Sequence, residues 1–208
     1  HNLLILSDEI YSELSFKDNY ESISNFCPEK TIISTGLSKW CGAGGWRLGY
    51  FILPESLKKI TDTLNILASE TFSSVSAPIQ YAAIQAYEGD HSEYIKSSKN
   101  ILKAVGTYVY ENLNSNKILI NKPEGGFYLM PELITNKYNT SSEMCNDILE
   151  DTGVALLPGS DFGFGKKKMI VRLSFTDFNG RNFMQEYKKK HQIDIDLISK
   201  YAAKVVEE

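Results

Sequence analysis

Apolar residues in the first half of the chain fall into short runs that alternate with helical patterns. Three short apolar runs end at polar or turn-prone residues, as buried strands do, and they occupy residues 3–6, 31–34 and 50–53. An amphipathic helix follows at residues 55–70, and a second helix, rich in small residues, at residues 77–87. A third helix should begin near Asp90, because Asp90 and Glu93 form an acidic variant of the capping box. The alternation predicts an α/β fold.

The second half has shorter elements. Strands are expected at residues 117–121, 126–130, 154–157 and 169–175, with a helix starting at the Thr140–Glu143 capping pair and an amphipathic helix over 181–206 that closes the chain. We therefore expect two domains. Residues 1–114 would be the C-terminal part of a large domain with a mostly parallel sheet and a connecting helix, and residues 115–208 a small α/β domain.

Composition narrows the class of protein. The 208 residues are 42% hydrophobic and 23% charged, which is typical of a globular chain with a sizeable core. The net charge of −4, without a long basic block, argues against a nucleic-acid partner. Three scattered cysteines without a CxxC pair indicate reduced thiols and a cytoplasmic protein.

Other signals are missing from the sequence. No apolar run approaches the ~20 residues of a membrane span. His1, His91 and His191 share no ligand spacing, so no metal site is expected. The chain opens directly into an apolar run without an initiator Met, and we expect an upstream portion.

The segment 34–50 is the most specific part of the sequence. Lys39 follows an expected strand and precedes Gly42, Gly44 and Gly45, so a partly desolvated lysine would sit on a loop that allows close approach of a ligand. Arg47 could bind a phosphate through two parallel hydrogen bonds. The alternatives are a solvated loop lysine, or a dinucleotide-binding loop. Arg47 stands where that second motif requires its third glycine, and no strand directly precedes Gly42.

Arg172 is the candidate anion-binding residue of the second half. Alternation in residues 169–175 places Val171, Leu173 and Phe175 on one face of a strand and Arg172 on the other. An arginine in the middle of a strand favours an anionic ligand, although an edge strand that faces water would also tolerate it.

The segment 34–50, together with Asp8 and Tyr11 in the upstream run Ser7-Asp8-Glu9-Ile10-Tyr11, resembles two motifs of the class I and II aminotransferases. These are pyridoxal-phosphate enzymes of fold type I, and the likeness is greatest to the aspartate aminotransferase branch. Both motifs stand at the family's spacing. The resemblance spans nearly the whole chain but only the C-terminal half of the family's length, so it implies a mostly parallel-sheet cofactor domain followed by a small domain.

The resemblance also implies a role for each candidate residue. Lys39 would be joined to pyridoxal 5'-phosphate and would move protons during the reaction. Asp8 would pair with the ring nitrogen and Tyr11 would donate to the ring's phenolic oxygen. Arg47 and Ser38 would hold the phosphate, with Ser34 and Thr35 as alternative hydroxyl donors. Arg172, in the family's Arg-Leu-Ser element, would bind the substrate's α-carboxylate.

The activity that this implies is transfer of an amino group between an L-amino acid and a 2-oxo acid by a homodimer. The segment 69–83 resembles the family's dimer interface, and a polar connecting loop is an equally good interpretation of it. Alternative functions are a β-lyase, a lyase like aminocyclopropane-carboxylate synthase, or a non-catalytic regulatory domain. Many relatives carry a hydroxyl three residues before the lysine, where this chain has Gly36. The 208 residues alone are expected to be inactive.

Overall fold

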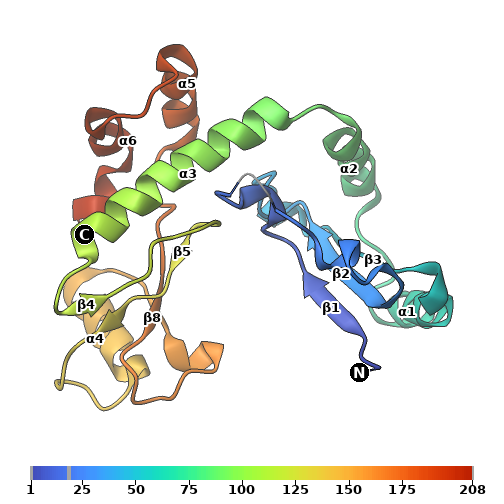
Figure 1. Ribbon diagram of the computed structural model, residues 1–208, viewed down its shortest axis with the longest axis horizontal. Helices are drawn as coiled ribbons and strands as arrows, with labels where there is room; N and C mark the ends of the chain where they lie inside the picture. Colours follow the sequence, from blue (N-terminus) through green and yellow to red (C-terminus); the bar gives the residue numbers. More distant parts are fainter. Residues whose placement is uncertain (1, 18–19, 208) are drawn as a thin grey trace. The chain divides into compact units, whose positions relative to one another are not determined.

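The computed structural model describes residues 2–17 and 20–207, and it divides into two compact units, residues 1–96 and 97–208 (Figure 1). Each unit combines helices with strands, as the expected α/β class requires. The long helix α3, Ser92–Leu113, begins in the first unit and runs mainly in the second. Each unit is described by itself below.

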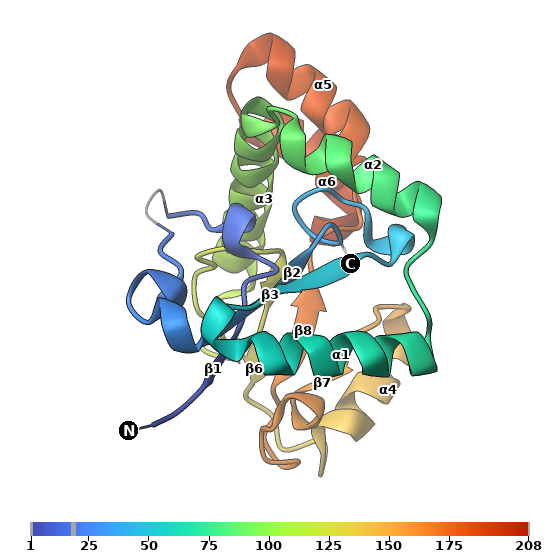
Figure 2. The same ribbon diagram turned by 90° about the vertical axis from the view of Figure 1, so that its right-hand side faces the viewer.

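The first unit is built on a three-stranded sheet with the order β1–β2–β3, which can be followed in Figures 1 and 2. Strand β1 is Ile5–Asp8, β2 is Thr31–Gly36 and β3 is Gly49–Ile52. The first pairing is parallel and the second is antiparallel. A mostly parallel sheet therefore remains a prediction for the large domain as a whole.

Two helices follow this sheet in sequence. A short 3₁₀ turn, Glu55–Leu57, leads into α1 at Lys58–Thr71, where the sequence predicted a single helix from residue 55. Helix α2 is Ala77–Glu88, with Pro78 in its first turn, where a missing N–H does no harm. The Asp90 carboxylate accepts the backbone N–H of Ser92 at 3.0 Å, so the expected cap marks the start of α3.

The second unit holds small antiparallel sheets and the remaining helices. One sheet has the order β5–β8–β7, formed by Tyr128–Leu129, Val171–Ser174 and Leu157–Pro158. A two-stranded sheet pairs β4, Ile118–Leu119, with β6, Glu132–Leu133, a short strand that the sequence pattern did not predict. Helix α4 is Ser141–Thr152, and its cap is as expected, because Glu143 N–H donates to the Thr140 hydroxyl at 3.1 Å.

The prediction of one closing helix over residues 181–206 is wrong. The structure has two helices, α5 at Gly180–Lys190 and α6 at Ile195–Glu207. His191 ends α5 in the left-handed conformation with φ 53°, and the Asp194 carboxylate caps the start of α6 by accepting Leu197 N–H at 2.8 Å. Residues 188–192 are all polar, and such a run fits either a solvated helical turn or a break between helices, so the pattern alone did not locate the break.

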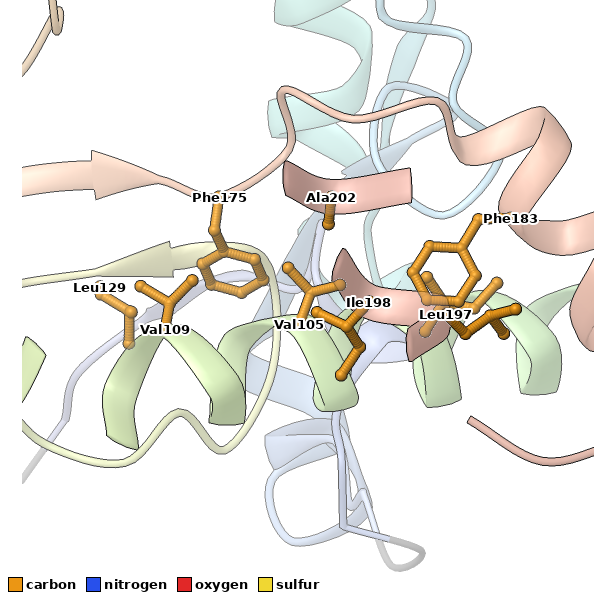
Figure 3. Packing of buried hydrophobic residues seen from close by; sticks show 9 residues of the cluster. Val105, Val109, Leu129, Phe175, Phe183, Leu197, Ile198 and Ala202 are labelled. Carbon is orange, nitrogen blue, oxygen red and sulfur yellow. The ribbon is translucent and has the colours of Figure 1, made fainter. Parts of the chain in front are cut away.

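A core of the second unit lies along α3. Val105 and Val109 project from α3 toward Phe175, which follows β8, while Phe183 of α5 and Leu197 of α6 complete the same cluster (Figure 3). Phe175 and Phe183 are fully buried. This packing explains why the structural division falls at residues 96/97, whereas the sequence predicted a domain boundary at 114/115: α3 buries its apolar face on the second unit.

Candidate active site

The candidate site of the first unit lies at the end of two parallel strands. Strand β1 ends at Asp8, which is paired in register with Ser34 of β2. Because parallel strands bring their carboxyl ends to the same sheet edge, Asp8 and the loop that follows Gly36 start from the same edge. Tyr11 lies just beyond β1, at the start of a 3₁₀ turn, and Lys39 lies just beyond β2.

Lys39 and Tyr11 are brought together by these two connections. The Lys39 Nζ atom lies 5.5 Å from the centre of the Tyr11 ring, within the range of a cation–π contact. Lys39 itself is half-buried and stands between Leu37, which is fully buried, and Trp40, which is 8% exposed. These two buried neighbours fix the backbone on either side of Lys39, so the loop holds the amine near the sheet edge.

The loop that carries Lys39 is closed by its own backbone. Ala43 N–H donates to the Leu37 carbonyl at 3.2 Å, and Gly42 N–H donates to the Lys39 carbonyl at 3.2 Å. Arg47 ends the loop in the left-handed conformation with φ 56°, and its guanidinium donates to the Gly44 carbonyl at 2.7 Å. The Arg47 side chain is exposed, and one of its donors is used by a carbonyl of its own loop.

Gly36 has no room for a side chain. It is paired with Gly49 across the antiparallel β2–β3 ladder. A Cβ atom at Gly36 would lie 2.6 Å from the Leu48 carbonyl oxygen and 2.8 Å from the Gly49 Cα atom, distances at which backbone would have to move. The hydroxyl that many relatives carry at this position is thus excluded here by the close approach of two strands.

Glu9 is a buried carboxylate next to this site, and the sequence placed it in the run from Ser7 to Tyr11 without giving it a role. It is 8% exposed, and its carboxylate accepts hydrogen bonds from Ser22 at 2.7 Å and from Ser7 at 3.1 Å. Burial of the phenol and then the nearby Glu9 carboxylate raise the pKa of Tyr20. Glu9 thereby ties the segment after Tyr11 to the strand that ends at Asp8. The sequence shows Glu9 within the motif run but does not show that its carboxylate is buried.

An aromatic cluster supports the lysine loop from the other side of β2. Trp40 lies 6.1 Å from Tyr87 and 6.0 Å from His91, measured between ring centres, and Tyr87 meets Tyr50 edge to face at 5.4 Å. These residues line a cleft of about 310 Å³ beside Ile33 and Thr35. Ile33 and Thr35 alternate with Ser34, so this cleft faces away from the side chain of Ser34, the strand partner of Asp8.

Tyr87 gives this cluster a measurable pH signature. Burial, followed by the hydrogen bond with Tyr50, raises the pKa of the Tyr87 phenol above its usual value near 10. We expect Tyr87 to stay protonated at pH 10, and its contribution to stability, which is complete below that pH, to fall as the pH rises through the folded-state pKa. The phenolate absorbance of the full-length protein, minus that of Tyr87→Phe, measures this titration. The same subtraction with Tyr94→Phe, which removes a 38% exposed tyrosine of α3 outside the proposed dimer segment, is the control. A Tyr87 signal that is half complete at pH 10 would contradict the expectation.

Arg172 belongs to the second unit and lies in β8, the central strand of its sheet. Val171 and Phe175 on the opposite face are buried, whereas Leu173 is half-buried and Ile170, on the side of Arg172, is also buried, so the alternation is only partial. The guanidinium carbon lies 4.4 Å from the ring centre of Tyr128 and 4.4 Å from that of Phe162. Among the described residues, no acidic side chain forms an ion pair with Arg172, so this cation is held by aromatic rings.

Comparison with known proteins identifies the family. The sequence profile described as "Aminotransferase class I and II" matches residues 1–183. The chain belongs to this aminotransferase family. It is 36% identical over 176 residues to a probable N-acetyl-LL-diaminopimelate aminotransferase of Bacillus subtilis, and 33% identical over 177 residues to an aspartate aminotransferase of Thermotoga maritima. Each match covers 84% of this chain and 43% of the relative, so the chain spans less than half the length of these aminotransferases.

Solved aminotransferases share the fold. The aspartate aminotransferase of Thermotoga maritima matches with a TM-score of 0.71 and 29% identity, over 99% of this chain and 47% of that one. The alanine aminotransferase of Pyrococcus furiosus matches with a TM-score of 0.74 and 29% identity, over 89% and 48%. The expected resemblance and its fold type are thereby confirmed. Pyridoxal phosphate, the cofactor expected from the sequence, is the cofactor on which this family depends.

The groups in the first unit suit that cofactor chemically. An amine at Lys39, a carboxylate at Asp8 and a phenol at Tyr11 leave the same sheet edge, and they complement an aldehyde, a ring nitrogen and a phenolic oxygen. Arg47 and the half-buried Ser38 lie in the lysine loop, where a phosphate would need donors.

In the part of the chain that the structure describes, no group of three or more His, Cys, Asp and Glu side chains could hold a metal ion. None of the described helices combines the length and the apolar character needed to cross a membrane.

Proposed function

We propose that the full-length protein is a pyridoxal-phosphate-dependent aminotransferase that moves an amino group between an L-amino acid and a 2-oxo acid. The observation that carries this proposal is the placement of Lys39 beside Tyr11 at the sheet edge where β1 ends in Asp8. A half-buried amine, a phenol and a carboxylate at one edge are the groups that this reaction needs.

Each residue has a distinct task in the proposed reaction. Bound pyridoxal phosphate supplies an aldehyde that takes up the amino group and a ring that accepts electrons. The Lys39 Nζ atom acts first as the base that accepts the proton from the substrate's Cα atom. It then acts as the acid that gives this proton up. The Asp8 carboxylate keeps a proton on the ring nitrogen, and the Tyr11 hydroxyl donates to the phenolic oxygen.

Binding of the two anionic groups completes the proposed site. Arg47 and Ser38 donate to the cofactor's phosphate, and Arg172 binds the substrate's α-carboxylate through the N–H groups of its planar guanidinium. The relatives support the substrate class, because their names describe transfer from aspartate or from N-acetyl-LL-diaminopimelate, both of which carry carboxylates.

We also propose that the whole enzyme is a cytoplasmic homodimer with domains divided at residues 114/115. Support for the dimer comes from the segment 69–83, where Phe72 and Tyr81 expose 64% and 74% of their surface. Support for the domain division is that α3 ends at Leu113, so a connecting helix would finish at the proposed boundary.

Product analysis of the full-length protein tests the proposed function. The purified protein, loaded with pyridoxal phosphate, is incubated with single amino acids and 2-oxoglutarate, and the products are identified by mass spectrometry. We expect a new 2-oxo acid and glutamate in equal amounts. Ammonia with pyruvate would instead indicate a β-lyase, and an aminocyclopropane carboxylate a lyase of that kind. No turnover of any amino acid would favour a regulatory domain.

A further inference from the structure

Two aromatic side chains, Tyr128 and Phe162, lie against the guanidinium of Arg172. They come from the two sides of strand β8. Tyr128 lies in β5, opposite Ser174, so it is a diagonal neighbour of Arg172 on the same face of the sheet. Phe162 lies in the 3₁₀ turn Gly159–Phe162 that follows β7, the strand on the other side of β8. Arg172 is thus flanked by one ring from each neighbouring strand segment.

The turn that carries Phe162 is fixed against the beginning of β8. Gly159 N–H donates to the Ile170 carbonyl at 2.7 Å, and Phe164 N–H closes the turn on the Gly159 carbonyl at 3.2 Å. Gly159 packs so closely that a Cβ atom there would lie 2.8 Å from the Ile170 carbonyl oxygen. The turn can therefore place the Phe162 ring reproducibly, two residues along β8 from its anchor at Ile170.

Aromatic rings hold a guanidinium differently from a carboxylate. A carboxylate partner would occupy the N–H groups at the edge of the guanidinium and would neutralise its charge. A ring instead contacts the face of the cation and leaves its edge donors available. The two rings at 4.4 Å orient Arg172 while it remains charged and able to bind a planar anion at its edge.

We propose that Tyr128 and Phe162 are positioning residues that hold the guanidinium of Arg172 for the α-carboxylate of the substrate. This inference rests on the role proposed above for Arg172 and extends it to two residues that do not themselves bind the carboxylate. Their action requires a ring at each position, since the contact is made through the π face. A variant that lacks one ring still has the charged Arg172, but the Arg172 side chain can then adopt other orientations.

Variants of the full-length, cofactor-loaded protein test this proposal. Phe162→Leu and Tyr128→Leu remove a ring and keep an apolar side chain, whereas Phe162→Tyr and Tyr128→Phe keep the ring. We expect each leucine variant to raise the KM for the amino acid with the best turnover by roughly 3- to 30-fold, the size of a cation–π contact. The ring-keeping variants should stay within about 2-fold, and the cofactor absorbance should not change.

A matched control is available in the same segment. Phe164 is 39% exposed, close to the 40% of Phe162, and among the described residues the rings within cation–π distance of Arg172 are Tyr128 and Phe162. Phe164→Leu should leave the KM unchanged. Circular dichroism and the cofactor absorbance establish that each variant is folded. Unchanged KM values in both folded leucine variants would overturn the proposal, and so would an equal rise in KM for Phe162→Tyr or for Phe164→Leu.

A second measurement separates this inference from the proposed function. Propionate carries a carboxylate but no amino group, and its Kd can be measured by calorimetry without turnover. We expect Arg172→Leu to abolish propionate binding and Phe162→Leu to weaken it by the same factor as it raises the KM. If no amino acid is turned over but propionate binding follows this order, the aminotransferase proposal fails and the role of the rings stands. If amino acids are turned over but propionate binding ignores both rings, the inference fails alone.

Discussion

Replacing Lys39 by alanine in the full-length protein is expected to lower the rate of amino transfer by at least about 10³-fold. General acid–base catalysis by a positioned group contributes about 10² to 10⁴, and Lys39 is also the proposed attachment point of the cofactor, so both effects are lost together. The rate is measured with the best amino acid from the product analysis. Reduction of the unaltered protein with borohydride, followed by peptide mass mapping, should place the pyridoxyl group on Lys39.

Lys58→Ala is a suitable control for this variant. Lys58 is in α1, where its amine pairs with Asp62 at 3.5 Å and its side chain is 65% exposed. Exposed pairs of this kind contribute little, so Lys58→Ala should keep the full rate. A pyridoxyl group found on a different lysine, or a Lys39→Ala protein with more than a tenth of the original activity, would remove Lys39 from the site.

Replacing Gly36 by serine is expected to destabilise the first unit. The new Cβ atom would press on the backbone of Leu48 and Gly49 at 2.6 and 2.8 Å, so β2 and β3 would have to separate. Overpacking of this kind costs about 1 to 3 kcal/mol, and more where backbone cannot shift. Thermal unfolding should show a lower Tm, and cofactor absorbance a loss of binding, because Lys39 follows β2 directly.

The neighbouring loop supplies the control for Gly36→Ser. A Cβ atom at Gly45 would have no heavy atom within 4 Å, so Gly45→Ser adds the same hydroxyl without a collision. Its Tm should stay close to that of the unaltered protein. If the two serine variants unfold at the same temperature, the close approach of β2 and β3 does not limit this position.

Local pattern was sufficient to predict the elements that present the site. The strands that end near Asp8 and Gly36 follow from short apolar runs, and the alternation around Arg172 follows from a period of two. These features depend on neighbours in sequence. The break at His191 does not, because the polar run 188–192 fits a solvated helical turn as well as a break, and nothing in it specifies a left-handed conformation at His191.

Contacts between segments that are distant in the chain could not be predicted from the sequence. The structural role of Glu9 depends on Ser22, a residue distant in sequence that donates a hydrogen bond to its buried carboxylate. The ring of Phe162 lies over Arg172 because β7 pairs with β8 and the following turn folds back, and no spacing in the chain encodes that pairing. In both cases the partner is supplied by tertiary structure, and single-sequence patterns do not contain it.

The Gly44 carbonyl, which accepts a hydrogen bond from Arg47, competes with any ligand for that guanidinium donor. An anion that Arg47 binds through the same N–H group must displace this bond of 2.7 Å, so that group contributes to binding only the difference between two hydrogen bonds. A dianion exceeds a neutral carbonyl as an acceptor, whereas a weakly charged solute gains little from the exchange. The internal bond therefore acts as a threshold that favours strongly charged ligands over the many weaker acceptors in solution.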